Sequence, residues 1–135
     1  MSGKTSTRIG TIGIDTAFLI DFFNGEKSAI LFMGKHAKLL RVSELVIYEF
    51  LCGNLTGREQ EVFMQAIQSF PAVPFQREAA IRGSRIFRTS KKEGKSIGHQ
   101  DCMIAGSYLA NGIERIVTRN AGHFSKMREI ELMRY

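Results

Sequence analysis

The chain has 135 residues, of which 44% are hydrophobic and 24% are charged, a composition that suits one soluble globular domain and excludes a disordered protein. Asp or Gly interrupts the apolar runs well before the length needed to cross a bilayer, and the first ten residues lack the apolar stretch of a secretory signal. The formal net charge of +6 favours a polyanionic partner such as nucleic acid. Cys52 and Cys102 form no CxxC pair, so we expect buried, reduced thiols in a cytoplasmic protein.

Short apolar segments alternate with amphipathic ones along the chain. We expect residues 1–10 to form a flexible lead and residues 11–135 to form a single domain. Strands are predicted at 11–15, 39–42, 71–75, 115–118 and 129–133, and helices at 16–24, 26–38, 44–52, 58–70, 76–93 and 98–110. Short strands that alternate with helices are typical of a parallel sheet covered on both faces. The sequence therefore predicts a three-layer α/β/α fold around a central parallel sheet of four or five short strands.

Three acids stand where the periodicity expects hydrophobic residues. Asp15 ends the first predicted strand, Glu49 is the one charged residue inside the apolar run LVIYEFLC, and Asp101 shares a helical stripe with Ile104. A buried carboxylate is costly unless a partner compensates its charge, and three such groups in one place repel one another. A bound Mg²⁺ or Mn²⁺ ion resolves both problems and supplies a water nucleophile for attack on a phosphate.

Each acid also has a purely structural explanation. Asp15 can cap a helix N-terminus, Glu49 can lie on a narrow solvated edge, and Asp101 can favour the dipole of its helix. Taken alone, Asp15 and Asp101 fit the structural explanation better, and it is their combination with Glu49 that favours a site. Asp21 lies six residues after Asp15, so we expect it to face away from the strand end, solvated or paired with a basic neighbour.

Four segments in order resemble the PIN domain family, and in particular the VapC-type toxins of prokaryotic toxin–antitoxin pairs. They are IDTAFLID, SELVIYEFLCG, Asp101 with the Ile-Ala pair that follows it, and IVTRNAGHF. The resemblance implies a metal-dependent endoribonuclease, arranged as a homodimer and inhibited by a small antitoxin. Its site residues in this sequence would be the metal-binding acids Asp15, Glu49 and Asp101, with Asn120 lining the site and Thr16 and Thr118 in support.

Two positions depart from that family pattern. Ala17 stands where Asn or Ser is usual, and His123 stands where many members carry a fourth acid. Asn120 can partly substitute for that acid, or His123 can contact the substrate phosphate. For a lone histidine, however, we expect a loop residue without a catalytic role. The departures keep open a second hypothesis, a catalytically weakened module that binds RNA or a partner protein without cutting. A third, a phosphohydrolase acting on nucleotides, is disfavoured because no Asp-x-Asp motif follows the first strand.

The helix predicted over residues 76–93 carries a basic residue at every third or fourth position. The ordinary explanation of such a stripe is a solvated helix face, but it also suits contact with phosphates, which gives affinity without sequence choice. We predict that the stripe contacts RNA through Arg82, Arg85, Arg88 and Lys92.

Overall fold

The computed structural model describes residues 10–135, and the lead expected over residues 1–10 lies outside this range except for Gly10. Five parallel strands form one sheet in the order β3-β2-β1-β4-β5. The strands are β1 (Ile12–Ile14), β2 (Leu40–Ser43), β3 (Ala72–Val73), β4 (Arg115–Val117) and β5 (Glu131–Met133). The prediction of a parallel sheet with four or five short strands is confirmed.

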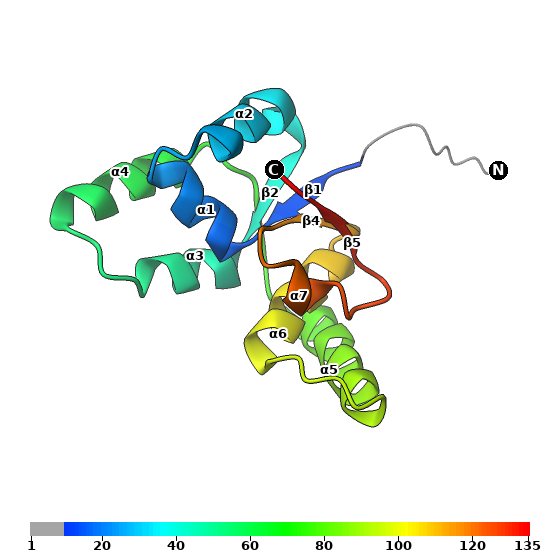
Figure 1. Ribbon diagram of the computed structural model, residues 1–135. Helices are drawn as coiled ribbons and strands as arrows, with labels where there is room; N and C mark the ends of the chain where they lie inside the picture. Colours follow the sequence, from blue (N-terminus) through cyan, green and yellow to red (C-terminus); the bar gives the residue numbers. More distant parts are fainter. Residues whose placement is uncertain (1–9) are drawn as a thin grey trace.

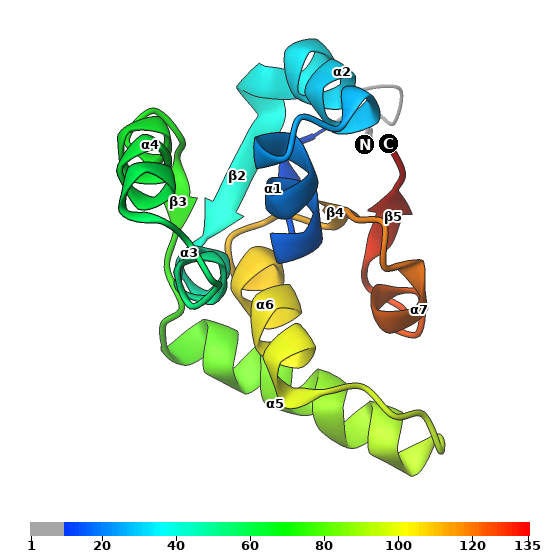
Figure 2. The same ribbon diagram turned by 60° about the vertical axis from the view of Figure 1, so that its left-hand side comes forward.

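Helices cover both sides of this sheet (Figures 1 and 2). In these views α1 to α4 gather on one side, and α5 and α6 lie on the other. The helices are α1 (Thr16–Phe23), α2 (Lys27–His36), α3 (Glu44–Leu51), α4 (Gly57–Ile67), α5 (Arg77–Lys92), α6 (His99–Ala110) and α7 (Ala121–Phe124), with a 3₁₀ turn, η1, at Ala37–Leu39. The three-layer α/β/α fold is thus confirmed, and none of the helices in the described residues is long and apolar enough to cross a membrane.

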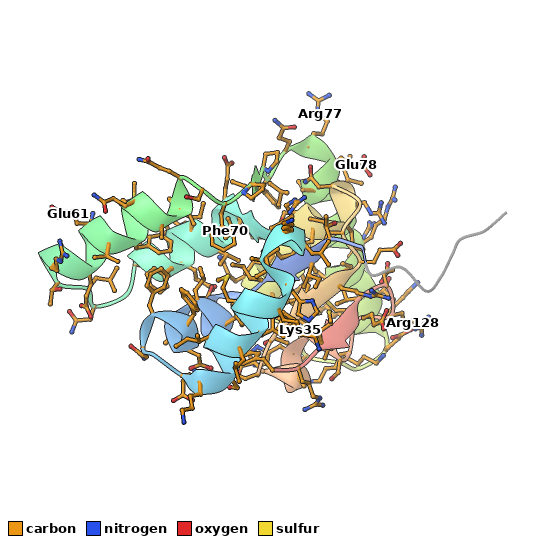
Figure 3. All side chains as sticks on the ribbon, turned by 90° about the horizontal axis from the view of Figure 1, so that it is seen from above. Lys35, Glu61, Phe70, Arg77, Glu78 and Arg128 are labelled. Atoms are coloured by element: carbon orange, nitrogen blue, oxygen red, sulfur yellow. The ribbon has the colours of Figure 1, made fainter. Side chains whose placement is uncertain are left out.

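The predicted elements agree with the observed ones to within a few residues at each end. Ser43 caps α3 by accepting a hydrogen bond from the backbone N–H of Leu45 at 3.1 Å, as expected for a serine before an apolar helix. The one helix that the sequence did not predict is α7, because four residues are too few to show a helical period. Seen from above, Glu61 on α4 and Arg128 after α7 mark opposite ends of the molecule, and Arg77 and Glu78 begin α5 (Figure 3).

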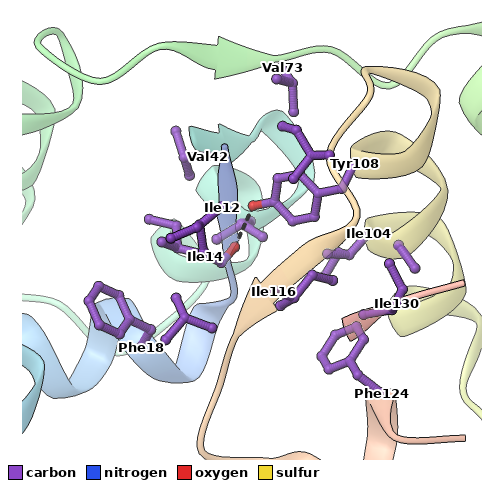
Figure 4. Packing of buried hydrophobic residues seen from close by; sticks show 14 of the residues in the cluster. Ile12, Ile14, Phe18, Val42, Val73, Ile104, Tyr108, Ile116, Phe124 and Ile130 are labelled. Carbon is purple, nitrogen blue, oxygen red and sulfur yellow. Dashed lines mark hydrogen bonds between the residues drawn. The ribbon is translucent and has the colours of Figure 1, made fainter. Parts of the chain in front are cut away.

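A tyrosine on α6 ties the core to the carboxyl ends of two strands. The ring of Tyr108 lies flat against Gly13, where a Cβ atom would come within 2.7 Å of it. Its hydroxyl donates to the carbonyl of Ile14 and accepts from the backbone N–H of Ser43 at 3.0 Å. Figure 4 shows the hydrogen bond between Tyr108 and Ile14, with the side chains of Ile12 and Ile14 on the opposite side of β1 from Tyr108. Tyr108 therefore fixes where α6 lies relative to β1 and β2.

The two cysteines differ from each other in exposure. Cys102 is buried, and burial together with the charge of Asp101 raises the pKa of its thiol to about 11. Cys52 is exposed at the C-terminal end of α3. The expectation of a buried thiol is therefore wrong for Cys52, because the apolar run that suggested burial ends at the last turn of that helix.

Candidate active site

Three carboxylates from three elements line one pocket of about 270 Å³ at the carboxyl ends of β1 and β4. Asp15 follows β1, Glu49 comes from α3 and Asp101 comes from the first turn of α6. The structure thus brings together the three acids that the sequence singled out. The other residues of the pocket wall are Thr16, Ala17, Ile20, Ile104, Arg119, Asn120, His123 and Phe124.

Asp15 is both a helix cap and a member of the pocket. Its Oδ1 accepts from the backbone N–H of Phe18 at 2.9 Å, which caps α1, and its Oδ2 accepts from the hydroxyl of Thr118. Only 4% of the residue is exposed. Burial and, to a smaller extent, the charges of Asp101 and Glu49 raise its pKa to about 6, although the two hydrogen bonds lower it. The structural explanation and the functional one therefore hold at the same residue.

Glu49 is half-buried on α3 and faces the start of α1. Its carboxylate accepts a hydrogen bond from the hydroxyl of Thr16. Thr16 thus restrains the second acid of the pocket in the same way that Thr118 restrains the first.

His123 contacts the third acid directly. Its Nδ1 lies 2.8 Å from Oδ2 of Asp101, and 62% of its side chain is exposed. The expectation of a loop residue is wrong, because His123 lies in α7, which carries the imidazole to the first turn of α6. The absence of a catalytic role for His123 stays a prediction. No sequence pattern signalled this contact, since α7 itself was not predicted.

Thr118 also orders the turn that follows β4. Its hydroxyl oxygen accepts from the backbone N–H of Asn120 at 2.8 Å while the hydroxyl donates to Asp15. The turn therefore holds Asn120 in the pocket wall and leaves its side chain exposed to solvent.

Asp21 does not face the pocket but is not solvated either. It is 7% exposed, its Oδ1 lies 3.0 Å from a guanidinium nitrogen of Arg119, and its Oδ2 accepts from the hydroxyl of Tyr135 at 2.5 Å. Of the two predicted alternatives, pairing with a basic neighbour is confirmed, and solvation is wrong. Tyr135 covers this part of α1, and its contact spans 114 residues of sequence, beyond the reach of helical periodicity.

Oxygen donors with unbalanced negative charge suit a hard divalent cation such as Mg²⁺ or Mn²⁺. In residues 10–135, however, no group of three His, Cys, Asp or Glu side chains is arranged to hold a metal ion directly. Mg²⁺ keeps several of its waters in protein sites. The pocket volume of about 270 Å³ therefore fits a partly hydrated ion that the carboxylates contact in part through water.

The basic stripe of α5 does not reach this pocket. Arg85, Arg88 and Lys92 are exposed and line a separate groove, and Arg82 is half-buried. In Figure 2 α5 lies on the far side of α6 from α1. Contact between RNA and this stripe remains a prediction, and it requires a ligand that extends beyond the pocket.

Comparison with known proteins gives a consistent result. Residues 12–130 match the PIN domain. Over 95 residues the chain is 30% identical to ribonuclease VapC3 of Methanocaldococcus jannaschii, an alignment that covers 70% of this chain and 95% of that protein.

Solved structures share the fold. A chain of DNA-bound VapBC from Salmonella typhimurium aligns with a TM-score of 0.83 and 21% identity, over 93% of this chain and 98% of that one. A toxin–antitoxin complex from Klebsiella pneumoniae aligns with a TM-score of 0.76 and 19% identity, over 90% of this chain and 96% of that one.

Proposed function

The chain belongs to the PIN domain family, and from this premise we propose that it is a metal-dependent endoribonuclease and the toxin of a toxin–antitoxin pair. One observation carries the proposal, namely the convergence of Asp15, Glu49 and Asp101 on a single pocket. The relative named ribonuclease VapC3 supports RNA as the substrate. The neighbours named as VapBC and toxin–antitoxin complexes support a partner antitoxin.

The residues of the pocket take distinct roles in this proposal. A bound Mg²⁺ or Mn²⁺ ion would supply activation of a water nucleophile and stabilisation of negative charge on the phosphodiester. Asp15, Glu49 and Asp101 would hold that ion, in part through its waters. Thr118 and Thr16 hold the first two carboxylates through their hydroxyls, and Asn120 offers an amide to the substrate at the pocket wall.

Partners beyond the pocket complete the proposal. An apolar groove of about 380 Å³ adjoins the pocket, shares Ile20 and Glu49 with it, and is otherwise lined by residues such as Phe23, Phe50 and Leu55. An apolar surface beside an acidic site supports a protein partner that blocks the site. We further propose that the protein is a cytoplasmic homodimer and that RNA contacts the basic stripe of α5 through Arg82, Arg85, Arg88 and Lys92.

The test is cleavage of RNA with Mn²⁺ by the wild type and by Asp101→Asn. We expect the variant to lose activity by about 10²–10³-fold, the range for removal of one electrostatic group from a site. Glu49→Gln and Glu44→Gln form a matched pair on α3, because Glu49 lines the pocket and Glu44 is exposed. Only Glu49→Gln is expected to lose activity, and equal cleavage by Asp101→Asn and the wild type would contradict the proposal.

A second candidate, the module that binds RNA or protein without cutting, has one observation in its favour. The imidazole of His123 contacts one carboxylate oxygen of Asp101, so that oxygen is not free to bind a metal ion. Under this hypothesis RNA binds equally well with and without a chelator, and no product forms with Mg²⁺ or Mn²⁺. The cleavage assay above separates the two candidates.

A further inference from the structure

Arg119 is one of the residues that line the acidic pocket. Its side chain is 53% exposed, and it comes from the turn after β4. The ion pair that fixes it lies outside the pocket, with Asp21 on α1 at 3.0 Å. Arg119 thus borders the pocket of the three carboxylates, while its charge is paired with a fourth carboxylate, Asp21, which does not line that pocket.

Asp21 is itself ordered by a second contact. Its other oxygen accepts from the hydroxyl of Tyr135 at 2.5 Å. The Tyr135 ring packs edge-on against Phe18, with centroids 5.0 Å apart. Burial and the carboxylate of Asp21 raise the pKa of Tyr135 above its usual value, so the hydroxyl stays protonated and keeps donating. Both oxygens of Asp21 are therefore engaged, which fixes the direction of the ion pair.

This arrangement leaves much of the guanidinium free. A guanidinium carries five N–H donors in a planar fork, and the ion pair with Asp21 is made through a single nitrogen of Arg119. The exposure of the side chain means that the remaining donors can bind a ligand without breaking the pair. The fork geometry matches two oxygens of one phosphate.

The negative charge of the pocket makes a contact between Arg119 and a phosphate useful for RNA binding. Three ionised carboxylates repel a polyanion, and one divalent ion leaves one of their negative charges without compensation. The charge of Arg119 is already balanced by Asp21, so its contribution is a set of N–H donors for the phosphate rather than a net positive charge. Because the guanidinium is tied to Asp21 rather than to Asp15, Glu49 or Asp101, it does not compete with an ion for the pocket carboxylates.

We propose that Arg119 binds the non-bridging oxygens of the phosphodiester that enters the pocket, and that Asp21 and Tyr135 are positioning residues for it. The inference rests on the proposed ribonuclease function and adds the residue that recognises the phosphate. The competing explanation is that the Arg119–Asp21 pair only ties the turn after β4 to α1.

The first experiment measures RNA affinity apart from cleavage. A short unstructured single-stranded RNA is titrated in a chelator against Asp101→Asn, with and without Arg119→Ala, over a range of salt concentrations. Loss of one phosphate contact lowers the slope of log Kd against log salt by about 0.7 for a single strand. Arg115→Ala is the matched control, because Arg115 lies at the other end of β4 and pairs with Glu131, and it should leave the slope unchanged.

The second experiment measures cleavage with Mn²⁺ in protein that retains Asp101. We expect Arg119→Ala to lower kcat/KM about 10²-fold, as for loss of one donor to a developing charge, and Arg119→Lys to recover part of that loss. Asp21→Asn should act through Arg119, so the double variant should be no worse than Arg119→Ala alone. A structural tie between the turn and α1 also predicts losses that do not add, because either substitution breaks the same pair. The salt slope of RNA binding separates the two explanations, since a structural tie leaves it unchanged.

The outcomes separate this inference from the function on which it rests. If the wild type cleaves RNA but Arg119→Ala matches it in kcat/KM and in salt slope, the inference is wrong and the ribonuclease stands. If the wild type cuts no RNA, the proposed function is wrong, and the salt slope alone decides whether Arg119 binds phosphate. Full additivity in the double variant overturns the positioning role of Asp21.

Discussion

Asp15 and Asp21 lie at the two ends of α1 and are equally hidden from solvent, yet their surroundings differ in kind. Asp15 is 4% exposed and receives hydrogen bonds from Thr118 and Phe18, with two further acids beside it and its pKa raised. Asp21 is 7% exposed and receives a guanidinium and a tyrosine hydroxyl. A buried carboxylate that has a cationic partner within the fold, such as Asp21, stabilises the structure. A buried carboxylate without one, such as Asp15, indicates a binding site.

The largest expected effect is that of Asp15→Asn. Removal of a metal-binding carboxylate should lower RNA cleavage by about 10³-fold, which corresponds to the several kcal/mol that an ion contributes to a transition state. In a chelator, the same variant should be more stable than the wild type at pH 8 by roughly 1–3 kcal/mol, because no charge is then buried without a partner. Urea unfolding measures the change in stability. If Asp15→Asn were less stable than the wild type at pH 8, the proposed difference between Asp15 and Asp21 would be contradicted.

The next effect is the pH dependence of that difference. The pKa of Asp15 is raised from 3.8 to about 6 in the folded protein, so the folded state holds this proton more tightly than the unfolded state. The contribution of Asp15 is therefore most favourable below pH 4 and is lost as the pH rises through 6, by about 3 kcal/mol in total. Relative to Asp15→Asn, the free energy of unfolding of the wild type should therefore decrease between pH 4 and pH 8, with both proteins measured in a chelator. A constant difference from pH 3 to 8 would contradict the assignment.

Asp21→Asn should have the opposite sign to Asp15→Asn. The same chemical change here removes a charged partner of Arg119 and Tyr135, and hydrogen bonds to charged groups contribute about 2 kcal/mol. We expect the free energy of unfolding at pH 8 to fall by about that amount. If Asp21→Asn destabilises the protein and Asp15→Asn stabilises it, the two carboxylates differ as proposed. If both substitutions change the free energy of unfolding in the same direction, that distinction is wrong.

The smallest effect concerns the hydroxyl that supports Asp15. Thr118→Val keeps the shape of the side chain but removes the donor to Asp15 and the acceptor for the backbone of Asn120. Loss of a partner that orients a metal-binding group costs about 10-fold in activity or affinity, and stability should fall by about 1 kcal/mol. Thr118→Ser keeps the hydroxyl and serves as the control, which should retain activity within a few-fold.

Much of this could be predicted because parallel sheets impose order on distant segments. Once the strands before Asp15 and Asn120 are identified, their carboxyl ends must meet at one edge of the sheet. Glu49 comes to the same edge on α3, which follows β2, and Asp101 comes to it on α6, which precedes β4. Local signals such as the Ser43 cap and the apolar run of β1 were sufficient for the element order. The roles of the residues in the pocket remain a proposal.

The contacts that the sequence did not reveal are made by side chains from short or irregular segments. Tyr135 covers Asp21 from the far end of the described chain, and α7 delivers His123 to Asp101. Neither segment has a periodic pattern, so nothing in the sequence marks which residue it will contact. Ala17 lines the pocket and is 6% exposed. Both positions at which this chain departs from the family pattern, Ala17 and His123, therefore line the pocket.

The most direct measurement is the thermal stability of the wild type and Asp15→Asn at pH 8 with and without Mn²⁺. If the pocket holds a divalent ion that compensates Asp15, Mn²⁺ should raise the Tm of the wild type with a concentration dependence set by its Kd. The same ion should leave the Tm of Asp15→Asn nearly unchanged. An equal rise in both proteins, or no rise in the wild type at millimolar Mn²⁺, would contradict the account.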